Sequence, residues 1–417
     1  MNSSAPAAPI RRGGLAKTYV DTRRRRLVLV LLLGALTTLG PFTMDLYLPA
    51  FPSVMIDLAT TEAGVQLTLT ATALGLGVGQ LIVGPLSDRF GRRRPLLAAT
   101  IAHVISSVGV VAAPSVEWVT IARFGQGFGA AAGVVVASAM IRDLFSWGRL
   151  IRMLARIALV SGLAPIAAPL IGSQLLQLMD WRGVFGVLAG MGGAIVAGAI
   201  VLAPETLHSD GRAAETRTAR DRVMTLLSDP IYIGAALVSA CSFAIIITFL
   251  SASPFIFQDD FGLNPQHFGW LFAINAVGLL VATQLAARLM RHFPAEHLLA
   301  AALPLMLASG FGLIASDGQV WPVAAFSFLL VSLTGFCGPC TGYLILEHHP
   351  REAGTAVAVS GFVNSIVAGT VSLLPAVFGD VSASALGTVV VVAAVAGVAA
   401  LPLVRGARES STTPTSS

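Results

Sequence analysis

The stretch LIVGPLSDRFGRRRPLLAA, residues 81–99, places one aspartate and four arginines between two apolar runs. The run before the charges covers 65–85 and the run after them covers 96–113. Each is close to the ~20 residues that a helix needs to cross a bilayer. A charge at membrane depth costs roughly 2.5–3.5 kcal/mol on insertion scales, so these charges mark a membrane surface. We therefore expect two membrane helices joined by a short, charged turn.

The rest of the chain repeats this pattern. Of its 417 residues, 55% are hydrophobic and only 11% are charged, which is typical of a protein that crosses the membrane many times. The fold class expected is an all-α integral membrane protein with twelve transmembrane helices. The expected spans are 27–50, 65–85, 96–113, 118–141, 157–177, 184–203, 231–255, 268–287, 298–315, 320–345, 355–378 and 382–404, and the first of them can continue towards Asp57.

The basic residues predict the orientation. Alternate loops, beginning with the N-terminal tail 1–26 and ending with the C-terminal tail 405–417, hold 24 of the 26 lysines and arginines. Basic loops stay on the cytoplasmic side, so both termini are expected there, with the protein in the inner membrane of a bacterium. The same residues are spread over seven loops rather than one face, which argues against binding to nucleic acid.

The longest polar connection, 204–230, divides the twelve spans into two bundles of six, 27–203 and 231–404. A faint internal repeat agrees, because 81–99 aligns with TQLAARLMRHFPAEHLLAA at 283–301. Both stretches join the second helix of a bundle to its third, as duplicated halves require. We expect a cytoplasmic linker between two similar six-helix bundles.

Three residues with acidic or basic side chains remain inside the expected spans: Asp45, His103 and Arg123. Intramembrane charges are candidates for function, and burial lets a carboxyl group change between protonated and charged forms. Asp45 and Arg123 are expected between the outer surface and the midplane, within coupling distance. Alternatives remain open: Asp45 can bond backbone freed by Pro41 or Pro49, Arg123 can snorkel to the interface, and His103 can serve as an interior hydrogen-bonding group or as a proton relay.

Several segments carry a family resemblance that covers nearly the whole chain. GPLSDRFGRRRPLL (84–97) resembles the signature loop of major facilitator superfamily transporters, and TMDLYLPAFP (43–52) and ARFGQGFGAAAG (122–133) resemble the first-span and fourth-span motifs of drug/proton antiporters. SGLAPIAAPLIGS (161–173) is similar to the fifth-span antiporter motif, although Ser173 stands where a second glycine is common. Segments farther on resemble the bicyclomycin and chloramphenicol resistance subgroup. The resemblance implies the two-bundle major facilitator fold.

The resemblance also implies roles for particular residues. Asp45 would bind the proton and Arg123 would tune its affinity. The loop residues would hold one closed conformation by charged contacts, although the loop can also be only a basic turn that fixes topology. The loop residues are Gly84, Asp88, Gly91, Arg92 and Arg93, and the antiporter-motif residues are Gly162, Pro165, Pro169 and Gly172. Apart from the resemblance, polar residues at membrane depth can either line a substrate cavity or bond a neighbouring helix. The substrate-cavity candidates are Tyr47, Gln126, Asn275 and Asn364.

Other motifs are weaker candidates. Cys337-Gly338-Pro339-Cys340 has the spacing of a redox motif, but it lies in an apolar span, so we expect a helix break with small packing residues. The pair His348-His349 lacks further metal ligands, and no GxxxxGK[ST] phosphate loop is present. No cofactor, no metal site and no enzymatic activity are therefore expected.

The sequence thus favours a proton-coupled multidrug exporter that works by alternating access as a monomer in the lipid bilayer. Chloramphenicol and bicyclomycin represent the expected class of small amphipathic substrates. Export of an endogenous metabolite or natural product is an alternative that the sequence leaves open. A membrane-embedded enzyme or a sensor is a more distant alternative, because neither a constellation of catalytic residues nor a signalling domain is evident.

Overall fold

The computed structural model describes residues 23–144, 147–207, 219–349, 352–372, 374 and 381–409, and within these ranges every regular element is a helix. The longer helices are α2 (Arg23–Asp45), α4 (Glu62–Phe90), α5 (Arg93–Val111), α6 (Val116–Leu144), α7 (Trp147–Leu175), α8 (Trp181–Leu202), α10 (Pro230–Pro254), α11 (Pro265–Leu289), α12 (Ala295–Ala315), α13 (Val320–Glu347), α14 (Ala353–Val371) and α16 (Ala383–Glu409). The shorter elements are η1 (Leu48–Ala50), α3 (Phe51–Asp57), α9 (Ala219–Leu227) and the π-helical turn η3 (Phe255–Asp260).

Short polar residues begin several of these helices. Thr61, Asp180 and Asn264 each accept a hydrogen bond from a backbone N–H in the first turn of α4, α8 and α11. Such caps satisfy donors that have no partner inside the helix. Gly91, with a φ of 92°, ends α4 and lets the chain reverse into α5 within a few residues. The sequence therefore folds into long helices joined by tight turns.

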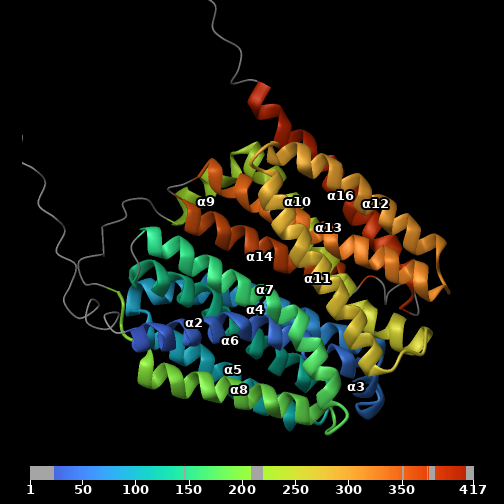
Figure 1. Cartoon of the computed structure of the whole chain (residues 1–417), viewed down its shortest axis with the longest axis horizontal. Coiled ribbons are helices and arrows are strands. Elements are labelled where there is room, and N and C mark those ends of the chain that lie inside the picture. The colour runs from blue at the N-terminus through green and yellow to red at the C-terminus, as the bar shows by residue number, and fades with distance from the viewer. Residues whose placement is uncertain are drawn as a thin grey trace, which may run out of the picture.

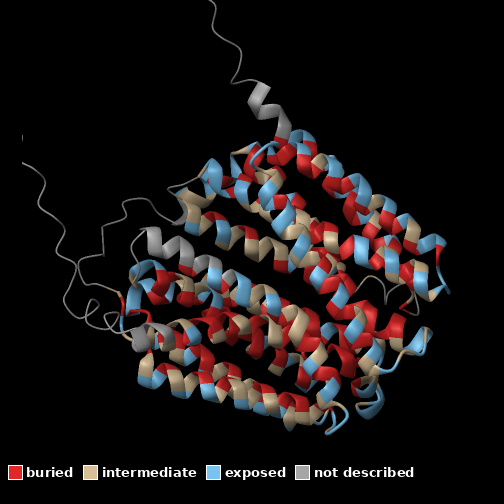
Figure 2. Cartoon of the chain, viewed as in Figure 1, coloured by how far each residue is buried: buried red, intermediate tan, exposed pale blue. Residues whose placement is uncertain are grey.

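Eleven of the described helical segments are long and apolar enough to cross a membrane, and the Leu159–Leu175 part of α7 is a shorter apolar segment. This agrees with the all-α membrane fold and the twelve spans expected from the sequence. Figure 2 shows exposed residues along many of the helices. Large apolar side chains such as Ile121 and Val201 are among the exposed residues, and such side chains suit contact with lipid.

The helices form two groups, coloured blue to green and yellow to red in Figure 1. Helices α2 and α4–α8 pack mainly on one another, as do α10–α14 and α16. Between the groups, α4 lies against α14 and α7 lies against α11. The two groups separate towards the end of the molecule that holds α9 (Figure 1).

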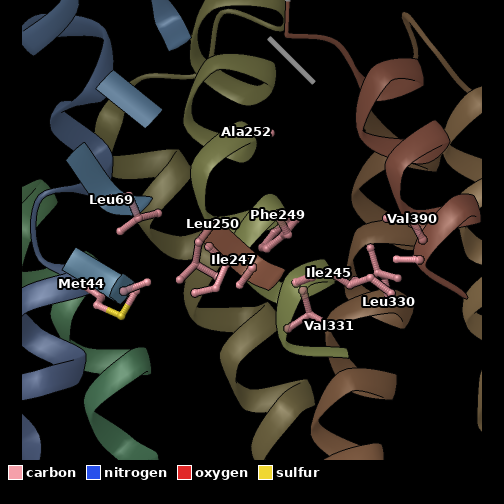
Figure 3. Packing of buried hydrophobic residues seen from close by; sticks show 14 of the residues in the cluster. Met44, Leu69, Ile245, Ile247, Phe249, Leu250, Ala252, Leu330, Val331 and Val390 are labelled. Atoms are coloured by element: carbon pink, nitrogen blue, oxygen red, sulfur yellow. The ribbon is translucent and has the colours of Figure 1, made fainter. Parts of the chain in front are cut away.

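Apolar contacts join the two groups at the end of the molecule farther from Arg23. Met44 and Leu69 belong to one cluster of buried side chains with Leu250 of α10 (Figure 3). The rings of Phe51 and Phe255 lie 5.7 Å apart, centroid to centroid, in the same cluster. Their burial removes apolar surface from contact with water and holds the two groups together at this end.

Hydrogen bonds accompany these apolar contacts. Thr70 Oγ1 and Ser372 Oγ lie 2.9 Å apart, and the Val381 N–H donates to Glu62 Oε2 at 2.9 Å. Each bond joins one group of helices to the other. The groups are therefore held together at one end by both polar and apolar contacts.

The expected helix break at Cys337–Cys340 was wrong, because α13 continues through it. Pro339 has no N–H to donate to the carbonyl of Gly335, four residues earlier. The Thr283 hydroxyl, from α11, lies 2.9 Å from that carbonyl and 2.8 Å from the Leu279 carbonyl, so the two carbonyls share its one proton. A neighbouring helix thus supplies the missing donor, which lets the helix continue. The expected linker 204–230 also holds a helix, α9.

Candidate functional site

Asp45 is the last residue of α2, at the point where the first span is interrupted before η1 and α3. Its side chain is buried, at 5% exposure, yet its carboxyl group makes no hydrogen bond or ion pair with any described residue. The alternative bond to backbone freed by Pro41 or Pro49 is therefore not formed in the described part of the chain. A carboxyl group placed in this way is a candidate for binding a proton.

Arg123, in α6, is completely buried and does not snorkel to the membrane surface. One terminal nitrogen donates to the Thr43 carbonyl at 2.7 Å and to Gln126 Oε1 at 2.9 Å. The guanidinium carbon lies 4.1 Å from the centre of the Tyr47 ring and 5.5 Å from that of Phe185. Aromatic faces stabilise a cation at such distances. Arg123 thus contacts the segment around Asp45 without forming an ion pair with it.

The bonds of Arg123 extend into a buried polar network across α2, α5 and α6. The Gln126 side-chain amide donates to Ser107 Oγ at 2.7 Å, and the Ser107 hydroxyl donates to the His103 carbonyl at 2.8 Å. His103 Nε2 lies 2.9 Å from Thr43 Oγ1. All of these side chains are buried, and bonded polar groups in a core fix its arrangement. Sequence reasoning missed Thr43 and Ser107, because Ser and Thr are frequent in this chain and neither stands out.

The four cavity candidates do not gather at one place. Tyr47 is buried beneath Arg123, with its hydroxyl 2.9 Å from Thr68 Oγ1, and Gln126 belongs to the network just described. Asn275, in α11, is buried and donates to the Leu271 carbonyl at 2.8 Å. Asn364, in α14, is half-buried and donates to Ser239 Oγ at 3.0 Å, and its side-chain oxygen has no partner among the described residues. Their contact with substrate stays a prediction.

The charged turn between α4 and α5 is built around Arg92. Its guanidinium forms ion pairs with Asp88 and, at 3.0 Å, with Asp143 of α6, and it donates to Ser87 Oγ at 3.0 Å. Burial by itself would lower the pKa of Arg92, but the bonds to the two aspartates outweigh it and raise the pKa. Gly84 lies one turn before this group and approaches α6, at a point where an added Cβ would lie 3.4 Å from Val135.

A second carboxyl group, that of Glu205, completes this turn. It follows α8 and accepts backbone N–H bonds from Arg92 at 2.8 Å and Arg93 at 3.2 Å, at the start of α5. These backbone bonds outweigh the opposing effect of burial and lower the pKa of Glu205. Gly91 leaves room for it, since an added Cβ would lie 2.4 Å from Glu205 Oε2. In the sequence, the signal for Glu205 is an acidic residue directly after an expected span. The sequence does not indicate which helix this residue caps.

The antiporter-motif residues lie along α7, where two glycines allow close approach. A Cβ added at Gly172 would lie 1.9 Å from the Leu46 carbonyl oxygen, next to Asp45 in the chain. A Cβ added at Gly162 would lie 3.0 Å from Leu280 of α11. Pro165 and Pro169 lie between them inside the helix. This part of α7 therefore contacts both the end of α2 and the other group of helices.

Two motifs remain, the cysteine pair and the histidine pair. Cys337 and Cys340 are buried free thiols in α13. His349 bonds to Asp229 Oδ2 at 2.9 Å beside Tyr232, and no group of three metal-ligating side chains occurs among the described residues.

Comparisons with known proteins show the family and the fold. The family model described as Major Facilitator Superfamily matches residues 31–372. A bicyclomycin resistance protein homolog of Haemophilus influenzae is 32% identical, over 84% of this chain and 88% of that protein. A chloramphenicol resistance protein of Pseudomonas aeruginosa is 30% identical, over 87% of this chain and 83% of that protein.

Solved structures share the fold. The crystal structure of a D-xylose-proton symporter, 18% identical, covers 93% of this chain and 99% of its own with a TM-score of 0.70. The match of the family model over most of the chain and the two curated relatives at 30% identity or more identify the protein as a multi-pass membrane transporter of small molecules. The chain belongs to the Major Facilitator Superfamily.

Proposed function

We propose that the protein exports small amphipathic drugs, of which chloramphenicol and bicyclomycin are the first candidates, in exchange for protons. The single observation that carries this proposal is the buried Asp45 carboxyl group, which has no hydrogen-bond partner among the described residues although it lies in a membrane span. Two curated relatives are named for resistance to these two antibiotics.

The chemistry of the site supports proton exchange. A buried carboxyl group without a partner favours its protonated form, whereas a nearby cation favours the charged form. Asp45 has Arg123 close by but not paired with it, so a modest rearrangement can change the balance. Proton binding and drug binding would oppose each other, and each must weaken the other by the same factor.

The arrangement of the two groups of helices supports alternating access. We propose that they are two domains, 27–203 and 231–404, joined by the linker 204–230, and that the tails 1–26 and 405–417 both lie in the cytoplasm of a bacterium, with the protein in its inner membrane. Contacts between the domains gather at the end farther from Arg23, as the bonds of Thr70 and Glu62 illustrate. The conformation would then be closed to the outside. Rocking of the domains about the site, with the protein acting as a monomer, would complete transport.

Drug–proton exchange in inverted membrane vesicles tests the proposal. The vesicles are acidified inside, and chloramphenicol or bicyclomycin is added while a quenched dye reports the pH. The native protein should release protons on drug addition, and Asp45→Asn should not. Asp57→Asn is the matched control, because Asp57 ends the same span but is bound to Arg182 and Trp181, and it should behave as native.

The outcomes separate the alternatives. Exchange that survives in Asp45→Asn would place the proton on another residue. If neither drug releases protons from vesicles that hold the native protein, drug export loses its support and export of an endogenous metabolite takes its place.

A further inference from the structure

His103 is a buried ionisable group that the proposed function leaves unused. It lies in α5, fully buried, with Nε2 2.9 Å from the hydroxyl oxygen of Thr43. Lone histidines in membrane spans commonly form interior hydrogen bonds or carry protons. The contacts around His103 distinguish these two roles.

The hydrogen bond between His103 and Thr43 has one consistent direction. The Thr43 hydroxyl has a single proton, and its oxygen lies 2.6 Å from the Leu39 carbonyl, which can only accept. The hydroxyl therefore donates to Leu39, and His103 must donate its Nε2–H to Thr43. The other ring nitrogen, Nδ1, has no partner among the described residues.

The surroundings favour a neutral imidazole. Nδ1 faces Gly192 of α8, where an added Cβ would lie 3.2 Å away, so that helix offers no side chain to accept a proton from it. The charged group near His103 is Arg123, from α6. A proton on Nδ1 would thus create a second buried cation without an acceptor, which is costly. The α2–η1 segment adds the ionisable groups of Asp45 and Tyr47, which lie around Arg123.

Thr43 is held at two atoms. Its hydroxyl accepts from His103, and its carbonyl, one of the last four of α2, accepts from Arg123 at 2.7 Å. Such terminal carbonyls lack partners inside the helix and attract cations. Asp45 follows two residues later. The two bonds thus fix the last turn of α2 and direct Arg123 to the Thr43 carbonyl rather than to Asp45.

We propose that His103 is a positioning residue for the proton site. As a neutral donor it holds Thr43, and this keeps Arg123 outside ion-pair distance of Asp45. The inference rests on Asp45 being the proton-binding group of the proposed function. Without this bond, Arg123 can turn to Asp45, because its Nε and second terminal nitrogen have no hydrogen-bond partner among the described residues. The ion pair would then oppose proton binding.

Labelling of Asp45 by dicyclohexylcarbodiimide, which reacts with protonated carboxyl groups, tests the proposal without any transport substrate. The purified protein is labelled over a range of pH, and mass spectrometry of the Asp45 peptide gives the pH at which half is labelled. His103→Gln keeps a side-chain N–H donor of similar reach but cannot titrate, and His103→Leu removes the donor. At Thr43, the hydrogen-bond partner of His103, Thr43→Ser keeps the hydroxyl group and Thr43→Val removes it.

The Gln and Ser variants should label as the native protein does. His103→Leu and Thr43→Val should each lower the pH of half-labelling by about one unit, the smaller effect of an opposite charge at contact distance, with the same maximum in acid. The double variant should shift no further than either single variant, because both remove the same bond.

An unchanged pH of half-labelling in both His103→Leu and Thr43→Val would overturn the proposal. A His103→Gln variant that behaves as His103→Leu would also overturn it, since an N–H donor at this position would then not be what keeps Arg123 away from Asp45. If His103→Leu does not fold, the comparison of Thr43→Val with Thr43→Ser tests the proposal by itself. Chloramphenicol exchange is measured separately on the native protein, so failure of the proposed function is distinguishable from failure of the positioning role.

Discussion

The close approach of α7 to the end of α2 predicts a strong effect of adding one methyl group at Gly172. An alanine Cβ there would lie 1.9 Å from the Leu46 carbonyl oxygen, whereas real Cβ contacts essentially never fall below 3.0 Å. The two backbones must therefore separate by at least 1.1 Å, the difference between these two distances. Overpacking of this kind typically costs about 1–3 kcal/mol.

Gly186→Ala is the matched control. Gly186 lies inside α8 with nothing within 4 Å of an added Cβ, so it experiences only the change in helix propensity. That change favours alanine by about 1 kcal/mol in both variants, so the difference between them isolates the overlap at Gly172. We expect Gly186→Ala to melt at or above the native temperature and Gly172→Ala to melt roughly 2–6 °C below Gly186→Ala.

Thermal unfolding of the purified proteins and chloramphenicol-driven proton release measure the two consequences together. Because Leu46 follows Asp45, Gly172→Ala should also weaken proton release, whereas Gly186→Ala should leave it unchanged. Equal melting temperatures and equal exchange in the two variants would refute the reasoning, since they would show that α7 does not limit the position of the α2 end.

Two further predictions concern polar contacts outside this point. Glu205→Gln removes the charge and one acceptor oxygen at the start of α5, and we expect a loss of about 1 kcal/mol in unfolding experiments at neutral pH. Because folding lowers the pKa of Glu205 below its ordinary 4.5, the stabilisation is fully present above that pH, and the difference from native should disappear as the pH falls below it. Thr283→Val leaves the Gly335 carbonyl without a donor and should lower stability by about 1–3 kcal/mol, whereas Thr283→Ser should keep native stability, as comparison of the two melting curves will show.

The sequence was sufficient to predict the membrane fold because apolar runs indicate the membrane spans and basic loops indicate the connections outside the membrane. The apolar segments of the structure correspond to the twelve expected spans. The first span continues to Asp57, as the sequence allowed, but the structure divides it into α2, η1 and α3 near Pro49 and Pro52. The continuity of α13 was not foreseeable, because it depends on Thr283 from a different helix.

The site was only partly predictable for the same reason. Asp45 and Arg123 stand out because charges are rare at membrane depth, and both are buried where α2 and α6 meet. Their relation did not follow from depth alone, since Arg123 bonds to the Thr43 carbonyl rather than to Asp45. A backbone carbonyl has no sequence signature, so a cation that binds one cannot be assigned from residue types.

Interaction partners from other helices were the hardest part of the site to predict from the sequence. Arg92 was recognised from its motif, but Asp143 lies 51 residues away and Glu205 lies 113 residues away. Aspartates and glutamates at helix ends are common, so only the packing of α6 and α8 against the turn selects these two. Helix packing thus decides which of many ordinary polar residues take part.

Packing also suggests how the proposed movement between the two groups of helices would reach Asp45. Gly172 contacts the Leu46 carbonyl, and its neighbour Ser173 accepts a hydrogen bond from Gln266 of α11 at 3.0 Å through its carbonyl. One turn of α7 therefore contacts both the segment that holds Asp45 and the other group of helices. Separation of α7 from α11 would remove the second contact and free this turn to shift. The packing at Gly172 is close enough that an added Cβ would overlap the Leu46 carbonyl oxygen, so movement of α7 towards α2 would displace the end of α2. The bonds of Thr43 to His103 and Arg123 resist that shift from the other side. Asp45 thus lies between a contact with the other group of helices and a pair of bonds within its own group. If the proposed function holds, movement of one group against the other would reach Asp45 through α7.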